Sequence, residues 1–245
     1  MKIVNCVWEI RNIGCKTAEL TFEKGERVDK AVFDCLDQEY DYIVVRAPIL
    51  EGKMYADLSS RGYSFIENQI TFEKRWQDFI VMDRLYKRTL DKVTISKVID
   101  EADLKRLLSR ITRDMFVTDR ISLDPHFGAD YAVRRYCYWS EDMYHQGYNV
   151  YKVNLDGKEV AFSINKITAD GTLVVPLGGG FTDVDGVATG PTALLAIYKM
   201  KETGMVFKRF KAKISSNNLP MIRVYNKLQF EQTHFDYIFV KHINR

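Results

Sequence analysis

Two polar residues near the end of the chain, Asn218 and Tyr225, lie on a segment that predicts a short helix. The apolar side chains of Met221, Val224 and Leu228 would share one face of this helix with Tyr225. A tyrosine hydroxyl can act as a general acid and protonate a leaving atom, and the asparagine amide can bond to a ligand. Both residues also have plain structural roles, because tyrosine is common in helix cores and asparagine often caps a helix.

A glycine-containing loop at residues 183–192 is a second place where chemistry could occur. The exposed N–H groups at the start of a helix form a cradle for a phosphate group, and the helix dipole helps to hold it. Gly186 and Gly190 would let the backbone approach such a group closely. Asp183 and Asp185 would repel it, so they would have to point away or interact with an amine instead. The alternative is a glycine cluster before an ordinary helix.

The hydrophobic pattern around these segments predicts alternating strands and helices. Strands are indicated at residues 93–98, 148–153, 159–167, 172–177 and 210–214, and helices at 104–111, 131–144, 193–198 and 221–228. The Asp-Gly pairs at residues 156–157 and 170–171 predict tight turns between antiparallel strands. With a last strand after Phe230, the order is strand, two helices, three antiparallel strands, helix, strand, helix, strand.

The N-terminal part contains a faint echo of the end of this pattern. Residues 42–48 predict a strand, residues 58–63 the end of a helix, and residues 65–72 another strand. Gly62 would lie at the place of Gln229 in the later segment. Any strand–helix–strand unit would look similar, so kinship between the two segments stays open.

A polar stretch at residues 83–92 is the best candidate for a linker. It divides the chain into an N-terminal α/β domain, residues 1–88, and a larger domain, residues 89–245.

The segment that carries Asn218 and Tyr225 resembles the C-terminal signature of the GNAT superfamily of N-acetyltransferases. The resemblance rests on the order strand, Asn218, helix with Tyr225, and then Leu228-x-Phe230. It implies an α/β protein with the GNAT acyl-CoA N-acyltransferase fold, whose central sheet is mixed and mostly antiparallel, preceded by the smaller N-terminal α/β domain. It also implies acetyl-CoA as co-substrate and direct acetyl transfer to a primary amine.

In this family two neighbouring strands part and the thioester lies in the gap. The resemblance therefore implies that Tyr225 protonates the departing CoA thiolate and that Asn218 bonds to the pantetheine arm. Backbone N–H groups would bind the cofactor and polarise the thioester carbonyl. The cofactor-binding residues implied are Phe181, Thr182, Asp183, Val184, Gly186, Val187, Ala188, Thr189 and Gly190. The chain departs from the family in the spacing of the loop glycines and in Gln229, where a glycine is usual.

Residues 121–127 and 134–139 narrow the resemblance to the dTDP-fucosamine acetyltransferases, whose acceptor is the amino sugar of a nucleotide-sugar. Arginine side chains match a diphosphate, and aromatic side chains match flat rings. The substrate-binding residues implied are His126, Arg134, Arg135, Tyr136 and Trp139. The aromatic residues could instead belong to the core, and one of the two adjacent arginines must point elsewhere. The base that takes the amine proton stays open between Asp183, Asp185 and His126.

Composition argues against several other classes of protein. The net charge is only +3 and the charges are interspersed, so no nucleic-acid partner is expected. No apolar run is long enough to span a bilayer, and we expect a cytoplasmic protein. The four cysteines and four histidines lack metal-ligand spacing, so no metal is expected. An acetyltransferase for a peptide, lysine or small-molecule amine and a non-catalytic acyl-CoA-binding module remain as alternatives, and a homodimer stays open.

Overall fold

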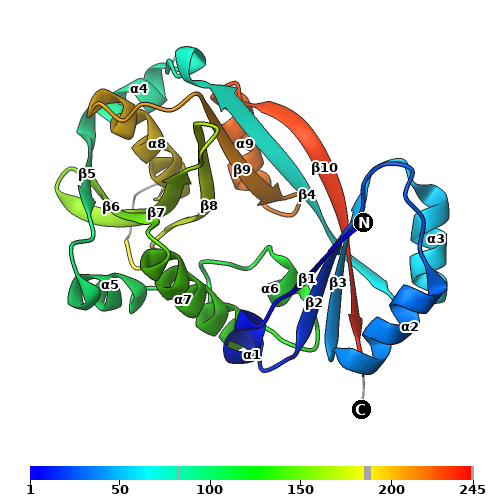
Figure 1. Ribbon diagram of the computed structural model, residues 1–245. Coiled ribbons are helices and arrows are strands. Elements are labelled where there is room, and N and C mark those ends of the chain that lie inside the picture. The colour runs from blue at the N-terminus through cyan, green and yellow to red at the C-terminus, as the bar shows by residue number, and fades with distance from the viewer. Residues whose placement is uncertain (82, 185–188, 244–245) are drawn as a thin grey trace.

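The strands of the protein form one large sheet. A computed structural model describes residues 1–81, 83–184 and 189–243, and within them ten strands follow the order β1-β2-β3-β10-β4-β9-β8-β7-β6-β5 (Figure 1). The pairs β2–β3 and β8–β9 are parallel, and the other neighbours are antiparallel. This mixed, mostly antiparallel sheet with helices on both faces confirms the predicted fold class.

The strands are β1 (Lys2–Asn5), β2 (Thr17–Thr21), β3 (Tyr42–Pro48), β4 (Ser64–Arg75), β5 (Val93–Lys97), β6 (Asn149–Leu155), β7 (Lys158–Ile167), β8 (Thr172–Gly180), β9 (Arg209–Ser215) and β10 (Glu231–His242). The α-helices are α1 (Trp8–Ile13), α2 (Lys30–Glu39), α3 (Gly52–Ser60), α4 (Arg84–Lys92), α5 (Glu101–Leu108), α6 (Arg120–Leu123), α7 (Ala129–His145), α8 (Thr189–Glu202) and α9 (Leu219–Lys227).

The order of elements predicted from residue 93 onward is confirmed, with the short helix α6 added between α5 and α7. Local signals explain the boundaries. Asp100 caps α5 by accepting a hydrogen bond from the N–H of Asp103 at 2.8 Å. Asp156 and Gly157 have φ angles of 49° and 78°, which suit the two central positions of the tight turn between β6 and β7.

The polar stretch that was expected to be a linker is the helix α4, so this expectation was wrong. Asp83 caps the helix through the N–H groups of Leu85 and Tyr86, at 2.9 and 3.1 Å. Leu90 is buried and α4 lies against α8. The stretch looked like a linker because most of its residues face solvent, as on any amphipathic surface helix. The division of the chain at residue 88 stays a prediction.

The unit β3–α3–β4 matches the unit β9–α9–β10 element by element. The strands β3 and β9 have seven residues each, α3 and α9 nine, and β4 and β10 twelve. Gly62 and Gln229, which follow the two helices, both have left-handed φ angles, 81° and 58°. The strand β4 lies between β9 and β10, and β10 lies between β3 and β4. The last strand of each unit therefore sits beside the first strand of the other.

Three hydrophobic clusters form the core. The helices α4, α8 and α9 pack with β5–β9, the helices α5–α7 pack on the other face of the sheet, and α2 and α3 pack on β2, β3 and β10. Val44 belongs to the cluster of α5–α7 and Val45 to that of α2 and α3, so these helices cover opposite faces of β3. Among the helices that the structure describes, none has the length and apolar character needed to cross a membrane.

Candidate active site

The parallel strands β8 and β9 are paired only where they begin. Their register runs from Thr172 opposite Arg209 to Val174 opposite Lys211, although β8 continues to Gly180 and β9 to Ser215. On its other side, β8 carries one extra residue against β7 between the pairs Val174–Lys166 and Leu177–Ile164. Such a bulge bends the strand that contains it. The two strands therefore part beyond Val174, in agreement with the geometry implied by the family resemblance.

Glycines let the end of β8 come close to its neighbours. A Cβ atom added at Gly180 would lie 2.2 Å from the Thr189 hydroxyl oxygen and 2.5 Å from the backbone carbon of Thr189. A Cβ atom at Gly179 would lie 3.0 Å from the ring of Phe116. The start of α8 is therefore held directly against the parted end of β8.

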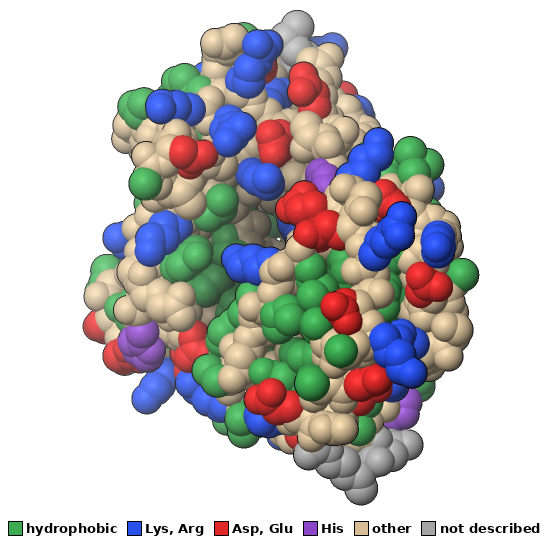
Figure 2. Space-filling view, turned by 45° about the vertical axis from the view of Figure 1, so that its right-hand side comes forward, with side chains coloured by type: hydrophobic (Ala, Val, Ile, Leu, Met, Phe, Trp, Pro, Cys, Tyr) green, Lys and Arg blue, Asp and Glu red, His purple; other side chains and the backbone are tan. Residues whose placement is uncertain are grey.

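A cavity of about 970 Å³ occupies this region. Its walls come from β8, β9, the starts of α8 and α9, and the helices α6 and α7, together with residues of β2, β3 and β4. Of the residues predicted from sequence, the cavity brings together Thr182, Thr189, Gly190, Asn218, Tyr225, Arg135, Tyr136 and Trp139. The molecular surface is hollowed near the centre of Figure 2, where charged and hydrophobic side chains lie side by side.

Tyr225 lines this cavity from α9 and is otherwise enclosed by aromatic rings. It stacks on Phe72 with ring centroids 4.6 Å apart and meets the edge of Phe230 at 4.9 Å. Burial, with a smaller effect of Tyr198, raises the pKa of Tyr225 above its ordinary value. The phenol therefore stays protonated at neutral pH, the state that a general acid needs. Its catalytic role stays a prediction.

Asn218 caps α9 in addition to lining the cavity. Its side-chain oxygen accepts a hydrogen bond from the N–H of Met221 at 3.2 Å. The plain structural role considered for this residue is thus present, and the amide NH₂ group is left able to donate to a ligand.

Three other predicted cofactor residues already interact with other parts of the protein. The N–H of Phe181 donates to the carbonyl of Val160 at 2.8 Å, and its buried ring stacks on Phe162. Asp183 pairs at 2.7 Å with Arg110, which also pairs with Glu159 at 3.0 Å. Val184 packs against two core clusters. Gly186, Val187 and Ala188 lie outside the described residues, as does Asp185.

The acceptor residues predicted on α7 do not all line the cavity. Arg135 lies over the ring of Trp139, with its guanidinium carbon 5.0 Å from the ring centroid, and the Tyr136 hydroxyl donates to Asp119. Arg134 instead donates to the carbonyl of Asn12 at 2.7 Å and is not among the residues that line the cavity. One of the two adjacent arginines thus points elsewhere, as the sequence required.

A buried charge network in the cavity wall was missed from the sequence. Glu9 is 1% exposed and accepts hydrogen bonds from Arg120 at 3.2 Å and Arg135 at 2.9 Å. Burial alone would raise the pKa of Glu9, but Arg135 and Arg120 outweigh it and lower the pKa. Arg46 donates to Glu19 at 2.6 Å across β3 and β2. For Glu19 and Arg46 the available signal was a single charged residue within each strand. Only the pairing of β2 with β3 shows that the two side chains meet.

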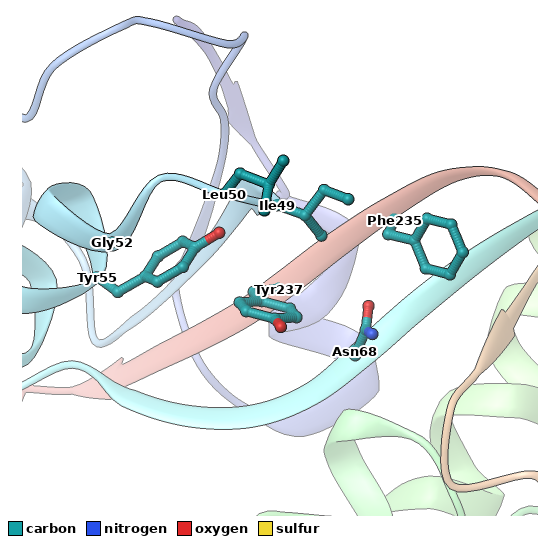
Figure 3. Close-up of a pocket in the computed structure, with 7 residues that line it drawn as sticks. All are labelled: Ile49, Leu50, Gly52, Tyr55, Asn68, Phe235 and Tyr237. Atoms are coloured by element: carbon teal, nitrogen blue, oxygen red, sulfur yellow. The ribbon is translucent and has the colours of Figure 1, made fainter.

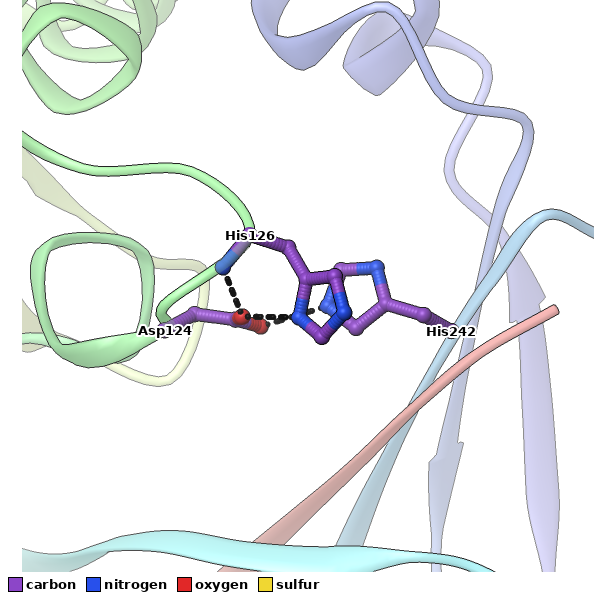
Figure 4. Close-up of side chains that lie close together, drawn as sticks. All are labelled: Asp124, His126 and His242. Carbon is purple, nitrogen blue, oxygen red and sulfur yellow. Dashed lines mark hydrogen bonds and ion pairs between the residues drawn. The ribbon is translucent and has the colours of Figure 1, made fainter. Parts of the chain in front are cut away.

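His126 lies outside the cavity wall, in a cluster with Asp124 and His242 (Figure 4). Asp124 is buried and accepts hydrogen bonds from the His126 Nδ1 atom at 3.2 Å and from the His242 Nε2 atom at 2.8 Å. The ligand atoms of the three residues lie within 4.8 Å of one another, which is close enough for the three to hold one metal ion. The imidazole rings of His126 and His242 are stacked, with an angle of 22° between their planes. The His126 Nδ1 atom faces one carboxylate oxygen of Asp124 and the His242 Nε2 atom faces the other. The absence of a metal stays a prediction.

A second, smaller cavity of about 480 Å³ lies beside the start of α3 (Figure 3). The described residues around it are Ile49, Leu50, Gly52, Tyr55, Asn68, Phe235 and Tyr237. The Tyr55 hydroxyl donates to the carbonyl of Pro48 at 2.6 Å and accepts from the N–H of Glu51 at 3.1 Å. No carboxylate or histidine is among these residues, so they offer no side chain suited to proton transfer near neutral pH.

Comparison with known proteins shows the fold. No family model and no curated protein matches the chain. A GCN5-related N-acetyltransferase from Sphaerobacter thermophilus is similar over 83% of this chain and 60% of its own, at 10% identity and a TM-score of 0.57. A tandem GNAT protein from the clavulanic acid biosynthesis pathway matches 95% of this chain and 77% of its own, at 12% identity and a TM-score of 0.56. A functionally unknown conserved protein from Staphylococcus epidermidis matches 93% of this chain and 84% of its own, at 12% identity and a TM-score of 0.61. At these identities the similarity establishes the GNAT fold alone.

Proposed function

We propose, on the basis of this fold, that the protein is an acetyl-CoA-dependent N-acetyltransferase. The observation that carries the proposal is the parting of β8 and β9 beyond Val174, which opens onto a cavity lined by Asn218 and Tyr225. A thioester lying between the parted strands would meet the phenol from one side and an incoming amine from the other. Fold alone does not imply function, so the proposal depends on these side chains.

Each part of the cavity has a task in the proposed reaction. The backbone N–H groups of Thr189 and Gly190 at the start of α8 would hold the pyrophosphate of the cofactor. The Asn218 amide would donate to the pantetheine arm. A neutral amine would form a bond to the thioester carbonyl carbon, and the oxyanion would be stabilised by N–H groups that β8 no longer shares with β9. The carbon–sulfur bond would then break, with the Tyr225 hydroxyl giving its proton to the sulfur.

We further propose that the acceptor is an amine on a nucleotide-linked sugar. The cavity offers the aromatic faces of Trp139 and Tyr136 for flat or apolar rings. Arg120 also lines it, only 6% exposed, and the Nη1 atom of its guanidinium has no hydrogen-bond partner in the described part of the chain. A buried unpaired guanidinium nitrogen suits a phosphate oxygen of the acceptor.

Calorimetry with CoA, followed by assays of CoA release, tests the proposal. The acceptor panel contains a nucleotide-linked amino sugar, the free amino sugar, a lysine peptide and a small primary amine. We expect CoA binding and amine-dependent release, fastest with the nucleotide-linked sugar. Faster release with the peptide or the simple amine would contradict the acceptor but keep the enzyme class. CoA binding without release for any amine would favour an acyl-CoA-binding module.

A further inference from the structure

Glu67 of β4 is a buried carboxyl in the wall of the large cavity. It is 1% exposed, although carboxylates usually face solvent. In the sheet, β4 is the neighbour of β9, and Gln69 lies opposite Ser215, the last residue of β9. Glu67 is two residues beyond this pair and therefore lies next to the parted end of β9. The N-terminal part of the chain thus brings an acid to the gap.

A chain of hydrogen bonds across three strands orients this carboxyl. Glu19 of β2 accepts from the Arg46 Nε atom at 2.6 Å, and the Arg46 Nη1 atom donates to the Gln69 side-chain oxygen. The Gln69 amide nitrogen then donates to the Glu67 Oε1 atom at 3.1 Å. This arrangement holds one oxygen of Glu67, the Oε1 atom, in place. Catalytic bases are commonly oriented by a further group in this manner.

The second oxygen of Glu67 makes no direct hydrogen bond within the described part of the chain, although the Ser215 hydroxyl lies near enough to the carboxyl to lower its pKa. Its Oε2 atom is buried and has no hydrogen-bond partner among the described residues. An unpaired buried acceptor is costly, and natural proteins retain few of them. A ligand that donates a hydrogen bond would satisfy it.

The other acidic side chains of the cavity wall are already engaged or exposed. Glu9 and Glu19 are paired with arginines. Asp119 accepts from the N–H of Ile121 at 2.7 Å and from the Tyr136 hydroxyl. Asp114 is exposed. Among the described residues of the wall, Glu67 is therefore the acid with a buried oxygen ready for a new partner.

The surroundings of Glu67 suit proton transfer. Burial raises its pKa above the ordinary value, the Ser215 hydroxyl opposes this shift, and Asp119 adds to it. Arg120 of α6 lowers the pKa again, with a smaller effect than these. The balance is a raised pKa, which moves the carboxyl toward the range where a base works best at neutral pH.

We infer that Glu67 receives the amino group of the acceptor and takes its proton. The inference rests on the proposed acetyltransferase function and names the base which that function requires. As the nitrogen–carbon bond forms, one N–H proton passes to the Glu67 Oε2 atom, the carbon–sulfur bond breaks, and the sulfur takes the proton of Tyr225. Glu67 then loses its proton to solvent and Tyr225 regains one, so both groups return to their starting states.

The test compares the wild type with Glu67→Gln, Glu67→Asp and Glu73→Gln. Glu73 lies on the same strand, pairs with Lys211 and is not among the cavity-lining residues, so it is a matched control. The rate of amine-dependent CoA release is measured with saturating acetyl-CoA from about pH 5.5 to about pH 9.5, and CoA affinity and thermal unfolding are measured in parallel. We expect Glu67→Gln to lower kcat by about 100-fold or more and to abolish the fall of the rate at acidic pH.

The controls separate a catalytic role from a structural one. Glu67→Asp keeps the carboxyl, so it should retain the acidic limb at a reduced rate, and Glu73→Gln should stay within about twofold of the wild type. All three variants should bind CoA as the wild type does. A Glu67→Gln variant that keeps the rate and the acidic limb would overturn the inference while leaving the proposed function intact. A wild type that binds CoA and acetylates no amine would overturn both.

Discussion

The two strand–helix–strand units share one backbone plan, but they differ in how far their first strands stay paired with the parallel strands that precede them. Every boundary of β9–α9–β10 lies 167 residues after its counterpart in β3–α3–β4 (209 − 42, 219 − 52, 231 − 64). The first strand of the first unit, β3, is paired with the preceding strand β2 over five residues, from Thr17–Tyr42 to Thr21–Arg46. The first strand of the second unit, β9, is paired with the preceding parallel strand β8 over only three. The same plan therefore gives a closed sheet in one half and an open gap in the other.

The side chains at matching positions follow this difference. At the offset of 167 residues (225 − 58), Leu58 stands where the second unit has Tyr225, and Glu51 stands where it has Asn218. Glu51 makes no side-chain cap on α3, whereas Asn218 caps α9. The first unit thus lacks both the gap and the groups proposed for acyl transfer. What the first unit and the preceding strand β2 contribute is the polar wall formed by Glu19, Arg46 and Glu67.

Replacing Tyr225 by Phe should have the largest effect on catalysis. The variant keeps the ring that stacks on Phe72 and loses the hydroxyl that would protonate the leaving sulfur. We expect kcat for amine-dependent CoA release to fall by about 100-fold, the usual size of a lost general acid, with CoA affinity unchanged.

Tyr198→Phe is the matched control for this variant. Tyr198 is also buried, its pKa is also raised by burial, and it is not among the residues of the cavity wall. It should keep the wild-type kcat. Equal activity of the Tyr225 and Tyr198 variants would show that the second unit, like the first, carries no acid at this position.

Adding one methyl group at Gly180 should disturb the gap itself, because it changes the contact between β8 and α8. The new Cβ atom would overlap the side chain and backbone of Thr189, so β8 and α8 must move apart. Overpacking of this kind typically costs about 1–3 kcal/mol. Gly180→Ala should therefore lower the free energy of unfolding by this amount in urea titrations and weaken CoA binding. Gly52→Ala in the first unit meets no atom within 4 Å and has no positive φ, so it should change neither quantity appreciably.

The sequence predicted the second unit better than the first, for physical reasons. The order of elements from residue 93 onward follows from local periodicity and turns, and Asn218 and Tyr225 lie on one local helix. The wall supplied by the first unit depends on β4 lying between β9 and β10, a pairing of distant segments that local patterns do not encode. Glu67 looks like an outward-facing residue until the register of β4 is known. The stretch that forms α4 looked like a linker for a similar reason. Its one buried residue, Leu90, is buried by a tertiary contact that the local sequence does not show.

The stability of the protein should depend on Glu67 in a pH-dependent manner. Because its folded pKa is raised above the ordinary value of 4.5, the folded state binds its proton more tightly than the unfolded state does. The free energy of unfolding should therefore fall as the pH rises from about 4.5 through the folded pKa. Glu67→Gln removes this effect and should be more stable than the wild type by about 1 kcal/mol near neutral pH, with the advantage shrinking toward pH 4.5. Urea unfolding at several pH values measures it, and an advantage that is constant with pH would contradict the assignment.

The smallest expected effect is an absence: the first unit should bind no CoA. The parallel strands β2 and β3 are paired along the whole of β2, so they do not part to admit a pantetheine arm. The cavity beside α3 is walled mostly by apolar and aromatic side chains. Calorimetric titration should therefore give one CoA per chain.

The variants Lys213→Ala and Arg46→Ala compare matching positions of the two units, because Lys213–Asp236 and Arg46–Gln69 are matching pairs. If the pairs were functionally equivalent, the two variants would change CoA affinity alike. We expect Lys213→Ala, next to the gap, to weaken it, and Arg46→Ala to slow turnover through Glu67 while leaving CoA affinity within about twofold.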